Sequence, residues 1–220
     1  MPNATEAPGT TLPEFTITVP KNWYALDLDP RTRTSTIARL VEDRIGTDDS
    51  PQLRQLRRDL TGMLRSYARQ AASHGAIYAA LMDQVVQGIA LSASLVIAVG
   101  DAPRGDDGEP ILDAALLGRA MVTEDDPAET GEPPEPGAID TLAGRAARVR
   151  RTTNSGFTGT DGTSVATAES QYFVPVPGTD KVLAMTFSTP NLSVRPALDE
   201  LFDAIARSLE WAWGPERVPE

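Results

Sequence analysis

The sequence of 220 residues contains no cysteine and only one histidine, His74. Without cysteine the chain can form no disulfide, no thiolate metal site and no thiol nucleophile. A single histidine cannot supply the multi-histidine sites that most catalytic metals prefer. These absences exclude several classes of enzyme, and we expect neither a resident metal nor a cofactor.

Basic charge is scarce in one segment. Residues 101–140 hold twelve acidic side chains against Arg104 and Arg119, and the whole chain has a net charge of −11. An acidic protein repels the phosphates of nucleic acids and of anionic membranes. We therefore expect no nucleic-acid partner.

Long hydrophobic runs are also lacking. The most apolar window, residues 88–100, is shorter than the ~20 residues that span a bilayer. The first fifteen residues have neither a basic region nor an apolar stretch like those of a signal peptide. These features predict a cytoplasmic protein without membrane insertion.

The length and the 40% hydrophobic content are sufficient for one core of ordinary size. Residues 1–13 are mostly Pro, Thr, Gly and Ala, which is typical of a flexible N-terminal tail. We expect a single α+β domain over 14–213, with acidic loop insertions at 100–110 and 124–137, and a C-terminal tail over 214–220.

Three segments have helical periodicity. Apolar residues at spacings of three and four predict a short helix from Thr34 to Gly46. Ser50-Pro51 is a helix start that precedes a long apolar stripe ending at His74-Gly75. A third helix is expected from about Arg195 to Glu210, with Leu198, Leu201, Phe202, Ile205 and Leu209 on its buried face.

The remaining segments alternate as strands do. Residues 15–19 and 25–29 predict two short strands joined by a turn at 20–22. Residues 76–87 fit a strand buried on both faces, and 95–99 fit a core strand. Residues 120–123 are expected to form an edge strand. Residues 145–153 are expected to form a strand with one solvent-exposed face, and residues 156–162 a turn. Residues 165–176 and 182–187 predict a hairpin.

This order predicts a mostly antiparallel sheet packed by two N-terminal helices and a C-terminal helix, an α+β sandwich. The segments FTITVPKNWYALDL, YFVPVPGTDKVLAMTFSTPN and LDELFDAIARSLEW resemble the PsbP-like superfamily. That group includes an extrinsic photosystem subunit, a Ran-binding import factor, mycobacterial lipoproteins and bacterial effector chaperones. The resemblance implies a domain that binds proteins and does not catalyse, an adaptor or chaperone for a secreted or membrane-associated partner.

No catalytic residue is predicted. His74 lies at a helix end, where it is expected to cap the last carbonyl groups. Ser94 and Ser155 have no histidine at a suitable spacing, and the glycine-rich stretch 156–162 lacks the lysine of a phosphate-binding loop. Asp101, Asp106, Asp107 and Glu109 lack the spacing of a calcium-binding EF-hand loop, so we read them as a solvated acidic loop.

Two functions stay open at this point. The first is protein binding through exposed arginines of the long helix together with exposed tryptophans; the residues proposed for it are Arg54, Arg58, Arg65, Arg69, Trp23 and Trp213. The arginine stripe could also receive the chain's own acidic segment, and Trp211 is expected to close the core. The alternative is a small-molecule-binding or hydrolytic domain that uses carboxylates around Asp161 and Asp180.

Overall fold

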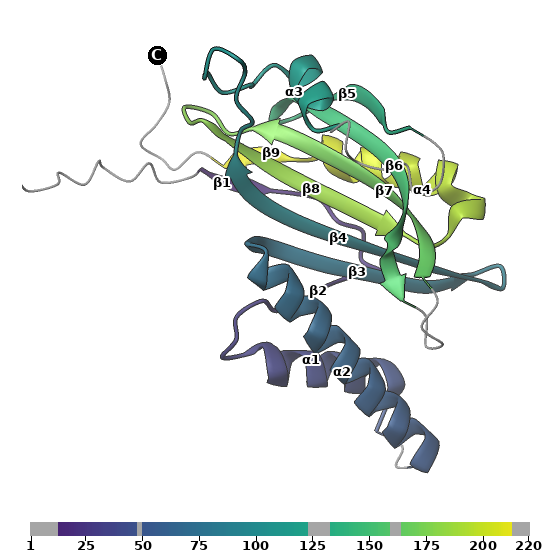
Figure 1. Ribbon diagram of the computed structural model, residues 1–220. Coiled ribbons are helices and arrows are strands. Elements are labelled where there is room, and N and C mark those ends of the chain that lie inside the picture. The colour runs from purple at the N-terminus through teal and green to yellow at the C-terminus, as the bar shows by residue number, and fades with distance from the viewer. Residues whose placement is uncertain (1–12, 48–49, 123–132, 159–163, 213–220) are drawn as a thin grey trace, which may run out of the picture.

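The computed structural model describes residues 13–47, 50–122, 133–158 and 164–212. Their main feature is an antiparallel sheet of seven strands (Figure 1). In spatial order these are β2 (Trp23–Ala25), β3 (Ala76–Val86), β4 (Ile89–Asp101), β8 (Lys181–Thr189), β7 (Ser164–Pro175), β6 (Gly144–Thr158) and β5 (Glu135–Thr141). A separate ribbon pairs β1 (Glu14–Thr16) with β9 (Glu210–Ala212). The predicted α+β fold with an antiparallel sheet is confirmed.

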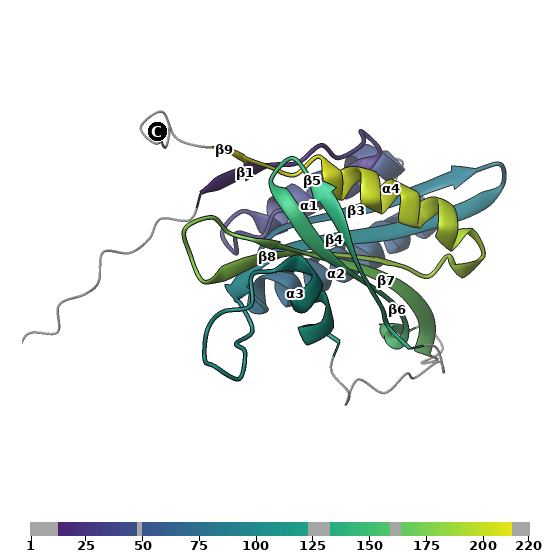
Figure 2. The ribbon, with the colours of Figure 1, turned by 90° about the horizontal axis from the view of Figure 1, so that it is seen from above.

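Helices cover both faces of the sheet. The helix α4 (Arg195–Arg207) follows the 3₁₀ turn η1 (Leu192–Val194) and packs on one face. The helix α3 (Ala114–Ala120) lies on the opposite face, over β5 and β6 (Figure 2). The helices α1 (Arg33–Ile45) and α2 (Pro51–Ser73) form a hairpin at the β2–β3 end of the sheet (Figure 1).

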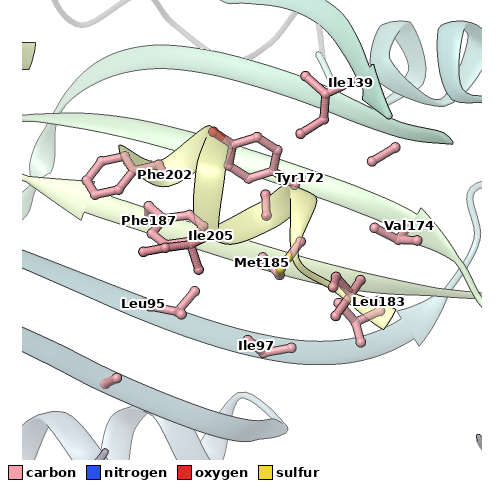
Figure 3. Packing of buried hydrophobic residues seen from close by; sticks show 14 of the residues in the cluster. Leu95, Ile97, Ile139, Tyr172, Val174, Leu183, Met185, Phe187, Phe202 and Ile205 are labelled. Carbon is pink, nitrogen blue, oxygen red and sulfur yellow. The ribbon is translucent and has the colours of Figure 1, made fainter. Parts of the chain in front are cut away.

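The largest core lies between α4 and the sheet. Alternation along β4 turns Leu95 and Ile97 toward this core, where both are fully buried. Phe202 of α4 stacks on Phe187 of β8 with 4.7 Å between ring centroids (Figure 3). The edge of Tyr172 meets Phe187 at 5.6 Å. The expected burial of Phe202 is confirmed, as is that of Trp211 beneath α4.

Local signals set the helical hairpin. Gly46 ends α1 at a φ of 82°, a conformation that favours glycine. The Ser50 side chain accepts a hydrogen bond from the Leu53 backbone and caps α2. The expected bounds of both helices agree with the structure. Together with Ala79 of β3 they enclose a smaller core, made of Leu26, Ile37, Val41, Ala68 and Ala71.

The N-terminal strands differ from the prediction. We expected 15–19 and 25–29 to form a pair, but β1 pairs with β9 and β2 pairs with β3. Leu26 is buried in the core of the helical hairpin. Each segment therefore pairs with a part of the chain that is distant in sequence, β1 with the strand after α4 and β2 with the edge of the main sheet.

Other boundaries also need correction. Ala120 belongs to α3 and not to an edge strand, and Glu135 to Gly137 belong to β5 and not to the acidic loop. Residues 156–158 continue β6 beyond the start of the expected turn. The C-terminal helix ends at Arg207 because the chain then enters β9.

The strand β3 is buried on both faces only over its middle. Ala79 and Ala80 are fully buried, whereas Ile77 is 53% and Val85 72% exposed. The strand extends beyond the helices that cover it, so its ends are exposed to solvent.

Three predicted segments lie mainly outside the described residues: the two tails and residues 124–132 of the acidic loop. Within the described ranges no helix is both long and apolar enough to cross a membrane. The long helix α2 is amphipathic, with arginines along one side.

Candidate functional site

The single histidine has a structural position. Its Nδ1 lies 2.8 Å from the carbonyl oxygen of Gln70 at the C-terminus of α2. This contact is the helix cap that the sequence predicts. Ser94, one of the two serines considered for nucleophilic chemistry, is 4% exposed and hydrogen-bonds the hydroxyl of Tyr67. Neither residue is arranged as part of a catalytic pair.

The carboxylates considered for hydrolysis do not form a described site. Asp180 pairs with Arg104 at 3.0 Å beside the turn between β7 and β8. Asp161 lies outside the described residues. Asp101, predicted in the acidic loop, is the last residue of β4 and pairs with Lys181 at 2.8 Å, and this ammonium group lowers the pKa of Asp101. Among the residues that the structure describes, no cluster of acidic or histidine side chains could hold a metal ion.

A charged cluster lies between α4 and the sheet. Asp203 accepts hydrogen bonds from Arg148, Arg150 and Tyr172 at 3.0, 3.0 and 2.6 Å. Asp199, one turn earlier, accepts a hydrogen bond from Ser170 at 2.7 Å and lies 3.4 Å from Arg195. Paired carboxylates therefore occur in this protein, but arginines neutralise them.

The charged cluster also changes the acidity of a tyrosine. Burial and the neighbouring Asp203 carboxylate together raise the pKa of Tyr172 well above its usual range. The phenol keeps its proton and donates it to Asp203. This arrangement holds α4 against the sheet.

The predicted arginine stripe lines one side of a groove between α1 and α2. The arginines of this groove are Arg54, Arg57, Arg58 and Arg65, and its lining also includes Glu42. The volume of the groove is about 420 Å³. Among the described residues that line it, four guanidinium groups accompany one carboxylate, a local excess of positive charge in a protein of net charge −11. We call this surface the arginine groove.

Two of these arginines also hold the helices together. Arg57 donates to the carbonyl oxygen of Gly46 at 2.8 Å, at the C-terminus of α1. Arg65 donates to the carbonyl oxygen of Thr34 at 3.3 Å, near the other end of α1. Because carbonyl groups carry no net charge, these two contacts do not neutralise the guanidinium groups. Arg54 and Arg58 are exposed and lie one turn apart.

The structure separates the other residues predicted for partner binding. Arg69 is exposed on α2 but does not line the arginine groove. Trp23 was expected to be exposed, yet it is 7% exposed. Its ring meets the rings of Phe187 and Phe202 edge-on at 6.1 and 6.4 Å, so burial against α4 removes it from any partner surface. Trp213 lies outside the described residues.

A second hollow lies between the helical hairpin and the sheet, and the sequence analysis did not predict it. Its volume is about 400 Å³. Most of its lining is apolar, from Leu40 and Ile45 of α1 and Leu60 and Leu64 of α2 to Leu81 of β3. We call it the apolar cavity. The excess of leucines on α2 was visible in the sequence, but periodicity cannot tell a filled core from a hollow one.

Comparison with known proteins identifies no family for this chain. No family model and no curated protein matches the chain. A solved structure of LpqN, involved in cell envelope biogenesis of Mycobacterium tuberculosis, aligns over 92% of this chain and 86% of its own, with 9% identity and a TM-score of 0.42. A protein from Bacteroides thetaiotaomicron aligns over 64% of this chain and 41% of its own, with 14% identity and a TM-score of 0.31. Likenesses this low carry no argument about function.

Proposed function

We propose that this chain is a non-catalytic binding domain of the PsbP-like kind, and that it holds a protein partner through the arginine groove. The partner presents an acidic segment. The observation that carries the proposal is the cluster of four arginines against one glutamate in a single groove. Guanidinium groups bind carboxylates in bidentate geometry, which favours recognition of Asp- and Glu-rich segments.

The arrangement of charge supports a specific contact. The protein as a whole repels acidic partners, whereas the local excess of arginine favours an acidic segment at this groove. An adaptor or chaperone for a secreted or membrane-associated protein would use such a surface. The small-molecule alternative draws support from a different feature, the apolar cavity.

The test is charge reversal at two exposed arginines of the groove, Arg54→Glu with Arg58→Glu. Arg57 and Arg65 stay intact because they bond the carbonyl groups of Gly46 and Thr34. The matched control is Arg69→Glu, which changes charge on the same helix outside the groove. Circular dichroism checks the fold of each variant.

Proteins from a lysate of the source organism are captured on the immobilised wild type and on each variant, and their amounts are compared. We expect the double variant to lose a partner that both the wild type and Arg69→Glu retain. The same partner should elute from the wild type as salt is raised. Equal capture by all three proteins would remove the groove from the interface.

A further inference from the structure

The apolar cavity has a closed end and an open end. At the closed end Leu26, Val41 and Met82 are 6%, 3% and 1% exposed. At the open end Met63 of α2 is 54% exposed, and the charged residues Arg44 and Asp83 are also exposed. The cavity is therefore apolar at its base and polar at its mouth.

The base of the cavity excludes polar ligands. Apart from Arg44 and Asp83 at the mouth, the cavity is lined by apolar side chains and by the hydroxyl groups of Tyr24, Tyr67 and Ser92. A polar ligand would lose its water without gaining enough hydrogen bonds in return. An alkyl chain makes no hydrogen bonds to water that it would lose there. Each methylene group that enters should strengthen binding by about fourfold.

One cationic residue, Arg44, and one anionic residue, Asp83, line the mouth. The guanidinium carbon of Arg44 lies 3.5 Å from the centre of the Tyr24 ring, so stacking holds this side chain beside the cavity. Arg44 is in the last turn of α1. An anionic headgroup on the ligand would meet its charge there, while the chain of the ligand extends toward Leu26.

The size of the cavity points to a small molecule and not to a protein segment. Its volume of about 400 Å³ falls at the small end of the range of about 300–1,000 Å³ for ligand pockets. An α-helix with side chains is about 10 Å wide and would need an open groove. Here α1, α2 and the β2–β3–β4 end of the sheet all contribute walls.

We propose that the apolar cavity binds a single-chain amphiphile with an anionic headgroup, such as a long-chain fatty acid. The alkyl chain occupies the base between α2 and the sheet, and the carboxylate lies at the mouth beside Arg44. This site is separate from the arginine groove, although Val41 of α1 contributes to both linings.

The first test measures affinity against chain length. Saturated fatty acids from octanoic to hexadecanoic acid displace a fluorescent probe, dansylaminoundecanoic acid, below their micelle concentrations. Affinity should rise by about fourfold per methylene and level off once the cavity is full. A primary alcohol of equal length should bind more weakly because it lacks the charge. Absence of saturable probe binding to the wild type would overturn the proposal.

The second test fills the cavity. Leu64→Trp places a larger side chain in the lining and should weaken binding by more than about tenfold. The matched control is Leu142→Trp, since Leu142 is 71% exposed and lies in the turn between β5 and β6, away from the cavity. Thermal melting shows whether each variant folds. A folded Leu64→Trp protein that binds like the wild type would refute the site.

The third test uses a pair of variants that leave the packing of the cavity lining unchanged. Met63 is exposed at the mouth, so Met63→Glu and Met63→Lys should both fold. The glutamate repels the headgroup and should weaken fatty-acid binding several-fold, whereas the lysine should maintain or strengthen it. Equal affinities of the two variants would contradict the anionic headgroup. The Arg54→Glu, Arg58→Glu protein should bind fatty acid normally, which separates this proposal from the proposed function.

Discussion

Asp203 lies on the buried face of α4, although removing a carboxylate from water is costly. Its oxygens are satisfied because the register of β6 and β7 puts Arg148 opposite Tyr172 and Arg150 opposite Ser170. All four residues face α4, where Asp203 and Asp199 lie one turn apart. The charged cluster fixes the position of α4 on the sheet.

We expect Tyr172→Phe to cost about 1.5 kcal/mol of unfolding free energy at pH 7, because Asp203 loses one buried hydrogen bond. The raised pKa of Tyr172 also makes stability depend on pH. The contribution of Tyr172 to the unfolding free energy is complete below about pH 10, where the phenol is protonated in the unfolded chain as well. This contribution is lost progressively as the pH rises above that value. The variant should therefore lose less stability in alkaline solution.

Urea denaturation between pH 7 and 11 measures both effects. Tyr78→Phe is the control. Burial alone raises the pKa of Tyr78, and within the described residues its hydroxyl group makes no hydrogen bond that the substitution would remove. It should cost little at pH 7. An alkaline slope unchanged by Tyr172→Phe would contradict the coupling to Asp203.

At the scale of elements, α4 was predicted from periodicity and its core contacts agree. Leu198, Phe202 and Ile205 are buried as expected, whereas Leu201 is only partly buried. The ends of elements were harder to predict. Glu210 fits a continued helix by sequence, but pairing of β9 with β1 ends α4 at Arg207. A partner nearly 200 positions away leaves no trace in a local pattern.

Phe202→Ala should cost about 3–5 kcal/mol, since the side chain is 1% exposed and stacks on Phe187. Chemical denaturation gives the change in unfolding free energy. Glu200→Ala is the matched control because Glu200 is exposed on the same helix, and it should alter stability by less than about 0.5 kcal/mol. Similar melting of Phe202→Ala and the parent protein would mean that α4 does not pack as described.

At the scale of the whole molecule, the helical hairpin stands apart from the rest of the core. Its small cluster holds α1 and α2 against β3, while α3 and α4 cover the other strands. Both candidate sites lie on this hairpin, the arginine groove between its helices and the apolar cavity between it and the sheet.

Replacing residues 124–132 by a short glycine-serine linker should change the melting temperature little, since the segment has no apolar periodicity and loop length affects stability weakly. Extending the replacement to Gly137 should cost on the order of 1–3 kcal/mol, because Glu135 to Gly137 pair with Arg148 to Arg150 in the sheet. Thermal melting compares the two. Equal stabilities would show that the start of β5 contributes nothing.

The sequence by itself determined α1, α2 and the body of α4, the hairpin of β7 with β8, the α+β class and the cap at His74, because each depends on neighbours a few residues apart. It also placed Arg54, Arg58 and Arg65 on one stripe. Only the tertiary structure decided that Trp23 is buried, that β1 pairs with β9, and that the leucines of α2 surround a cavity. These features depend on the distance between elements remote in the chain, and no local pattern of residues specifies that distance.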